Sequence, residues 1–156
     1  MDIRLIISLA VLILVLGVSV FLFFQLKKET AKVEMINSSG GSVFVDVELA
    51  DNAAKQTRGL MFRSSLGEDE GMLFIFNDDD YRTFWMMNTT IPLDAIFFSS
   101  NGSVVDVIQM APCKSLISCP TYPSTGKAKY VLEVNQGFAM KNGITAGNSS
   151  LVVQNW

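Results

Sequence analysis

The longest hydrophobic stretch of the chain lies near its start. From Leu5 to Phe24 the residues are apolar except for two serines and one glycine, and none is charged. A helix of about 20 apolar residues crosses the hydrocarbon core of a bilayer. A cleaved secretory signal has a shorter apolar stretch that ends in small residues, whereas this run ends in Phe-Leu-Phe-Phe. Residues 1–28 are therefore predicted to form a single-pass membrane anchor, and a cleaved signal is the alternative.

A different pattern begins after a polar segment at 29–41, which we expect to be a linker. Apolar and polar residues alternate from Val43 to Leu49, as in a strand with one buried face. Similar short runs predict further strands at 71–76, 83–87, 93–99, 104–110, 129–134 and 151–154. Residues 42–156 are therefore expected to form one strand-rich globular domain.

Turn and cap residues connect these predicted strands. Asn101 and Gly102 supply the positive φ angles of a tight hairpin turn, so the strands on either side are predicted to be antiparallel neighbours. Two short helices are expected, one capped by Asp51 and running to about Leu60, the other at 136–141 and ended by Gly143. The predicted class is α+β and predominantly β, with a small curved or barrel-like sheet and two short helices after an N-terminal transmembrane helix.

Composition and charge exclude several kinds of chemistry. The chain has 12 basic, 15 acidic and no histidine residues, so histidine-activated nucleophiles and imidazole metal ligands are excluded. The net charge of −3 and the pI near 4.8 argue against a nucleic-acid partner. The acidic runs at 68–70 and 78–80 are interpreted as solvated turns, and the methionines as core residues. We therefore expect no metal site and no cofactor.

Two cysteines bear on the location of the domain. Cys113 and Cys119 lie beside prolines, at a spacing that permits a loop-closing disulfide, and disulfides persist in oxidising compartments. Four Asn-x-Ser/Thr sequences also suit an exported domain, namely those at Asn37, Asn88, Asn101 and Asn148. The lysines that follow the apolar run favour the opposite orientation. We expect a protein of the cytoplasmic membrane with its globular domain outside the cytoplasm.

Several ordered motifs run through the predicted domain. They are Arg-Gly-Leu-Met-Phe-Arg at 58–63, Phe-Trp-Met-Met-Asn-Thr at 84–89, Ile-Pro-Leu-Asp at 91–94 and Tyr-Val-Leu-Glu-Val at 130–134. Together they resemble domain-of-unknown-function family 192, a prokaryotic family of small domains often preceded by an export signal or anchor. The resemblance implies a mainly β fold and an envelope location, but no established reaction. The family usually has lysine where this chain has Met87.

Glu133 draws attention because it lies within an otherwise apolar predicted strand. A carboxylate there must face water, a ligand or a buried cation. One interpretation is a structural ion pair with an arginine. The other is a pocket in which Trp85 stacks on a sugar face and polar groups bind hydroxyls. The candidate ligand-binding residues are Arg58, Arg63, Trp85, Asn88, Thr89, Asp94 and Glu133.

These residues support three hypotheses about function. The first is a membrane-anchored binding or accessory module for a cell-envelope glycan or protein, with no catalytic residue. The second is a hydrolase acting on an envelope glycan, because glycosidic cleavage needs two carboxyl groups, here Asp94 and Glu133, and no histidine. The third is a protein–protein interaction domain, which should expose a contiguous apolar patch.

Overall fold

The computed structural model describes residues 11–18, 30–113 and 118–152. Residues 11–18 form a helix inside the predicted membrane anchor, and the rest of that anchor lies outside the described residues. Within the described ranges, no helix is long and apolar enough to span a bilayer. The anchor therefore stays a prediction.

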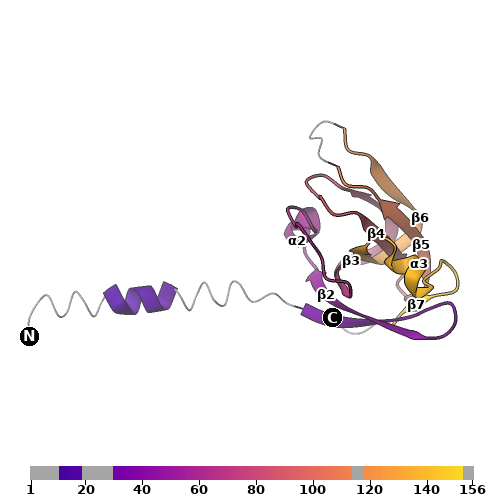
Figure 1. Ribbon diagram of the computed structural model, residues 1–156, viewed down its shortest axis with the longest axis horizontal. Helices are drawn as coiled ribbons and strands as arrows, with labels where there is room; N and C mark the ends of the chain where they lie inside the picture. Colours follow the sequence, from indigo (N-terminus) through magenta and orange to yellow (C-terminus); the bar gives the residue numbers. More distant parts are fainter. Residues whose placement is uncertain (1–10, 19–29, 114–117, 153–156) are drawn as a thin grey trace, which may run out of the picture.

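One seven-stranded sheet, curled into a half-barrel, forms the framework of the domain (Figure 1). The strands are β1 (Thr30–Ile36), β2 (Ser42–Ala50), β3 (Glu70–Trp85), β4 (Leu93–Phe98), β5 (Val104–Met110), β6 (Thr121–Asn135) and β7 (Ser150–Leu151). Their order in the sheet is β5-β4-β6-β3-β2-β1-β7. The β2–β3 pair is parallel and the other pairs are antiparallel. The predominantly β class and the curved sheet are thus confirmed.

The two ends of this sheet meet beside β7. Ser103, just before β5, forms an antiparallel bridge with Ser150. The Val104 N–H donates to the Ser149 carbonyl at 2.9 Å, and the Leu151 N–H donates to the Gly102 carbonyl at 2.7 Å. These bonds satisfy backbone groups that an open sheet would leave at its edge.

The predicted hairpin is present, since β4 and β5 pair as antiparallel neighbours. Gly102 has a φ of +85°, as the tight turn requires. Asn101 does not share this conformation; its side chain instead accepts a hydrogen bond from the Ser103 N–H at 3.0 Å. The asparagine therefore shapes the turn through its side chain.

Two short helices flank the sheet, close to their predicted positions. The helix α2 (Ala53–Arg58) is capped by Asn52 and not by Asp51, because the Asn52 side chain accepts from the Lys55 N–H. Asp51 forms an ion pair with the Lys55 ammonium at 2.9 Å. The helix α3 (Phe138–Asn142) ends at Gly143, which has a left-handed φ of 68°.

The expected linker at 29–41 needs correction, because most of it forms β1. Val33 and Met35 are fully buried, and β1 pairs with β2 along its whole length. The charged residues Lys32 and Glu34 alternate with them. The segment therefore has the alternation of a half-buried strand, although its average polarity is that of a linker.

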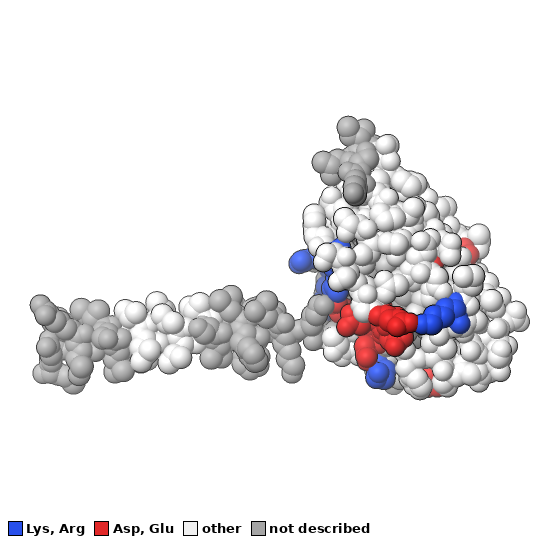
Figure 2. All heavy atoms as spheres, viewed as in Figure 1, with Lys and Arg blue, Asp and Glu red and all other residues white. Residues whose placement is uncertain are grey.

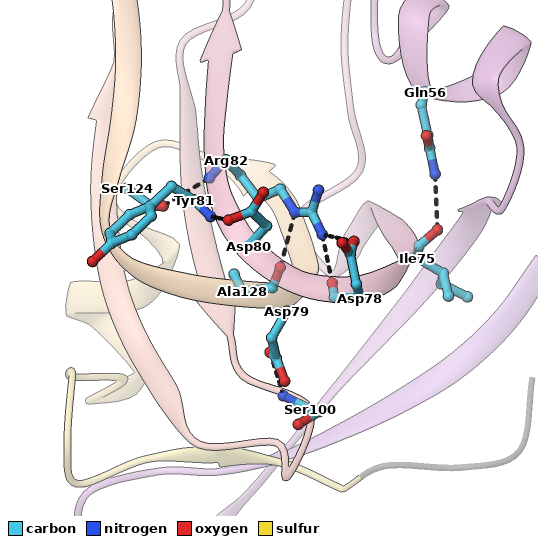
Figure 3. A network of polar contacts seen from close by, with 10 residues as sticks. All are labelled: Gln56, Ile75, Asp78, Asp79, Asp80, Tyr81, Arg82, Ser100, Ser124 and Ala128. Atoms are coloured by element: carbon cyan, nitrogen blue, oxygen red, sulfur yellow. Dashed lines mark hydrogen bonds and ion pairs between the residues drawn. The ribbon is translucent and has the colours of Figure 1, made fainter.

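The second acidic run lies within a strand and not in a solvated turn. The predicted strands 71–76 and 83–87 are parts of one strand, β3, whose pairing with β6 shifts register between them. The Arg82 guanidinium binds the Asp78 carboxylate at 2.7 Å and the Ala128 carbonyl at 2.9 Å (Figure 3). Its hydrogen bond also lowers the pKa of the Asp78 carboxyl. The arginine thus allows the acidic segment to continue the strand as a bulge.

The first acidic run contributes to a charged surface. Figure 2 shows acidic side chains gathered in one patch with basic side chains beside it. Asp46 pairs with Glu70 where β2 and β3 meet, and Lys32 binds Asp46 at 2.9 Å. Lys141 forms an ion pair with Glu68, which lowers the pKa of that exposed carboxyl. Lysines therefore partner carboxylates at this end of the sheet.

The sheet buries a separate hydrophobic cluster on each face. Alternate residues of β6 belong to different clusters: Leu132 and Val134 to the first and Val131 to the second. Ile96 and Ala95 of β4 divide in the same way. A residue's position along a central strand therefore decides which face its side chain reaches.

Candidate binding cleft

The carboxyl group of Glu133 is buried, and no residue that the structure describes partners it. It lies on β6 between Ala95 of β4 and Met72 of β3, and it is only 4 % exposed. Among the described residues, none donates a hydrogen bond to its side chain or forms an ion pair with it. Burial raises the pKa of this carboxyl to about 8, because a low-dielectric environment disfavours the charged form.

A narrow cavity of about 30 Å³ lies beside this carboxyl group. Its lining includes Arg58 at the end of α2, Trp85 at the end of β3, and Thr89, together with Glu133. Four of the seven predicted binding residues therefore come together. They do so because the register of β3 with β6 places Glu133 next to the Arg-Gly-Leu-Met turn after α2.

A wider groove of about 430 Å³ shares part of this lining. It lies between α2 and β3, and five aromatic side chains line it, namely Phe74, Phe76, Tyr81, Phe84 and Trp85. The rings of Phe74 and Phe84 pack edge to face with centroids 5.0 Å apart. Trp85 is 45 % exposed and borders both the groove and the Glu133 cavity.

Arg63 and Asn88 belong to a second pocket, of about 280 Å³. Phe62 and Asn88 both have positive φ angles, 64° and 55°, and the Phe62 N–H donates to the Asn88 carbonyl at 2.9 Å. Arg63 forms an ion pair with Glu48. The predicted ion pair between Glu133 and an arginine is therefore wrong, since the carboxylate that Arg63 binds is another one and Glu133 has no such partner.

Asp94 lies on the opposite face of the sheet from Glu133. In the β4–β6 ladder Asp94 pairs with Val134, whereas Glu133 pairs with Ala95. The Asp94 carboxylate is 1 % exposed and accepts the Gly137 and Ala139 N–H groups, both at 3.0 Å. It caps the start of α3. The pairing of Asp94 with Glu133 as two catalytic carboxyl groups is therefore excluded, and Asp94 does not line the cleft.

Replacing Asp94 by alanine is expected to destabilise the domain by about 2 kcal/mol, because two buried N–H groups lose their acceptor. Urea denaturation measures this change. Asp94→Asn keeps a carbonyl acceptor and should lose less. An Asp94→Ala variant as stable as the parent protein would contradict the capping role.

Comparison with known proteins places this geometry in a family. Residues 35–151 match the DUF192 family, described as uncharacterized ACR. The chain belongs to the DUF192 family. The match runs from Met35 of β1 to Leu151 of β7, so the curled sheet is the family's domain. None of the curated proteins matches the chain.

Two solved structures resemble this DUF192 domain. One, described as a "putative transcription regulator" from Sinorhizobium meliloti 1021, is 30 % identical with a TM-score of 0.71, and the match covers 80 % of this chain and 93 % of that one. The other, a protein of unknown function from Novosphingobium aromaticivorans DSM 12444, is 35 % identical with a TM-score of 0.70, and the match covers 81 % and 85 %. Neither description assigns a ligand.

The predicted disulfide of this DUF192 domain is formed between Cys113 and Cys119, whose Cα atoms are 5.7 Å apart. Cys113 forms an isolated bridge with Met87 and lines the pocket of Arg63 and Asn88. The disulfide therefore lies beside the chain segment that leads from Trp85 to Thr89, through the bridge between Cys113 and Met87.

The aromatic groove was not anticipated from the sequence. None of Gln56, Phe74, Phe76, Tyr81 and Phe84 is among the candidate ligand-binding residues predicted above. Alternation along a single long strand places Phe74, Phe76 and Phe84 on one face, but the sequence predicts two separate strands here, at 71–76 and 83–87. The groove becomes visible only once both segments are seen to belong to β3.

Proposed function

We propose that this DUF192 domain is a binding module for a glycan of the cell envelope, held in the groove between α2 and β3. The observation that carries the proposal is the position of Trp85. This half-exposed ring borders both an aromatic groove and a cavity that contains an unpartnered carboxyl group. Binding sites for small ligands combine apolar walls with a few polar groups in this way.

The chemistry of a sugar suits such a groove. A pyranose ring presents C–H groups on its faces and hydroxyls around its edge, so its faces pack on aromatic rings while its edge needs polar partners. Tyr81 and Trp85 are exposed aromatics of the groove, and Gln56, Thr57 and Thr83 add polar atoms. A groove of about 430 Å³ has the size of a typical small-ligand site.

An envelope location is part of the same proposal. The apolar N-terminal segment supports a membrane anchor. The disulfide between Cys113 and Cys119 supports an oxidising compartment. Both features support a location in which the groove is exposed to envelope polysaccharides.

The test is calorimetric titration of the full chain with tetramers of glucose, N-acetylglucosamine and glucosamine. At least one tetramer is expected to bind. Trp85→Ala is expected to weaken that binding about fivefold or more, because a stacking contact with an aromatic side chain contributes about 1–3 kcal/mol. Phe44→Ala is the matched control, because Phe44 is an exposed aromatic outside the groove. Failure of all three tetramers to bind would overturn the proposal.

A role in transcription has weaker support. It comes from the description of the Sinorhizobium meliloti structure alone. The net charge of −3 in this chain opposes binding to the phosphate backbone of DNA.

A further inference from the structure

The cavity beside Glu133 is too small for a sugar ring. Its volume of about 30 Å³ corresponds to one water-sized group. A Cβ atom at Gly59 would lie 3.4 Å from the Phe74 ring and 3.9 Å from Glu133 Oε2, so the glycine keeps this narrow space open. Any ligand that fills the cavity must therefore insert a single small group from the adjoining groove.

The walls of the cavity favour a cation. The carboxyl group of Glu133 has no hydrogen-bond donor or ion-pair partner among the described residues, and its ionised form can be buried only beside a partner. Phe74, Phe84 and Trp85 also line the cavity. Aromatic faces attract cations, more strongly where water is excluded.

Among the described residues that line the cavity, Arg58 is the one charged neighbour of Glu133. From α2, Arg58 lines the cavity, but it is exposed and forms no ion pair with Glu133. The residues that β3 contributes to the cavity are aromatic, and the β4 neighbour in the ladder is Ala95. A small cationic group could therefore reach Glu133 without displacing another ion pair.

We propose, on the basis of the function proposed above, that this cavity takes the primary ammonium group of an amino sugar whose ring lies in the aromatic groove. The ammonium donates hydrogen bonds to the Glu133 carboxylate and contacts the aromatic walls. The glycan bound by this domain therefore carries free amino groups, and not only hydroxyl or acetamido groups.

Proton release accompanies this binding. In the free protein burial raises the pKa of Glu133 to about 8, so the carboxyl is mostly protonated at pH 7. An adjacent ammonium lowers that pKa. The protonated carboxyl and the ammonium then become a carboxylate–ammonium pair, and one proton passes to the solvent. Affinity should rise with pH, by up to tenfold per unit, only while the free sugar amine and the Glu133 carboxyl of the free protein both keep their protons.

The experiment compares the glucosamine and N-acetylglucosamine tetramers by calorimetry at pH 6, in two buffers of different ionisation enthalpy. At this pH the sugar amine and the Glu133 carboxyl of the free protein are both mostly protonated. The glucosamine tetramer is expected to bind at least tenfold more tightly and to release close to one proton. Glu133→Gln should abolish both the preference and the proton release. Asp69→Asn, which removes an exposed carboxyl, should leave both unchanged. This variant controls for general electrostatic attraction between an acidic protein and a basic oligomer.

The outcomes separate the two proposals. Equal binding of the two tetramers, or a preference that survives in Glu133→Gln, overturns the ammonium site and leaves the glycan-binding function standing. Absence of binding by every tetramer, including that of glucose, overturns both.

Discussion

The free energy of unfolding of this domain is expected to fall between pH 5 and pH 8. Replacing Glu133 by glutamine is expected to abolish most of that fall. Burial raises the pKa of the Glu133 carboxyl to about 8 in the folded protein, from an ordinary value of 4.5. Between these values the folded state retains a proton that the unfolded state releases, so stability falls as pH rises. The full difference corresponds to roughly 5 kcal/mol above pH 8. Urea denaturation at one-unit steps from pH 4 to pH 9 measures the change.

Asp69→Asn is again the matched control, since it removes an exposed carboxyl directly before β3. Its stability should follow the pH dependence of the parent protein. If Glu133→Gln retained the same fall in stability between pH 5 and pH 8, the buried carboxyl would already be ionised and paired in the folded state.

Gly71→Ala is expected to destabilise the domain by about 3 kcal/mol. A Cβ atom at this position would lie 2.7 Å from the Glu133 carbonyl oxygen and 3.0 Å from Val134 Cγ1. The first neighbour is backbone in the centre of the sheet, so β3 and β6 would have to move apart. Thermal unfolding and urea denaturation both report the loss.

Gly41→Ala provides the comparison for this substitution. The Cβ there would approach only the Asn37 side chain, at 3.3 Å, in an exposed turn. Its stability should change by less than about 0.5 kcal/mol. Equal losses in the two variants would mean that the cost comes from the alanine itself and not from contact with β6.

Local signals located the turns and helix ends to within a residue. Gly102 and Gly143 both adopt the positive φ angles expected of them, because a left-handed residue is needed there and glycine adopts that conformation without strain. Asn52 took the cap predicted for Asp51, since either residue can accept the N-terminal N–H groups. Asp51 and Asn52 are neighbours with similar capping ability, so the sequence alone could not decide which of them caps α2.

The candidate site could be predicted only in part. Glu133 stood out because a carboxylate in an apolar strand needs an explanation, and Trp85 was named as the ring that would stack on a ligand beside it. Asp94 looked equivalent in the sequence. Its separation from Glu133 depends on the register of β4 with β6, and a shift of one residue would have placed both on the same face.

The boundaries of β1 and β3 were missed for an energetic reason. Each contains charged residues that a composition-based prediction assigns to solvent. In β3 the Arg82 guanidinium binds Asp78 and backbone carbonyls, so the acidic segment continues the strand instead of leaving it. Such compensation by a residue that lies several positions away becomes visible only once the chain is folded.

The central place of β6 has a consequence for the timing of folding. In sequence β6 follows β3, β4 and β5, yet in the sheet it lies between β3 and β4. Until β6 has been synthesised, β1, β2 and β3 form one group and the β4–β5 hairpin another, with no strand to join them. Long-range pairing of this kind slows folding. The nascent chain is therefore expected to complete its sheet only after residue 135 has left the ribosome.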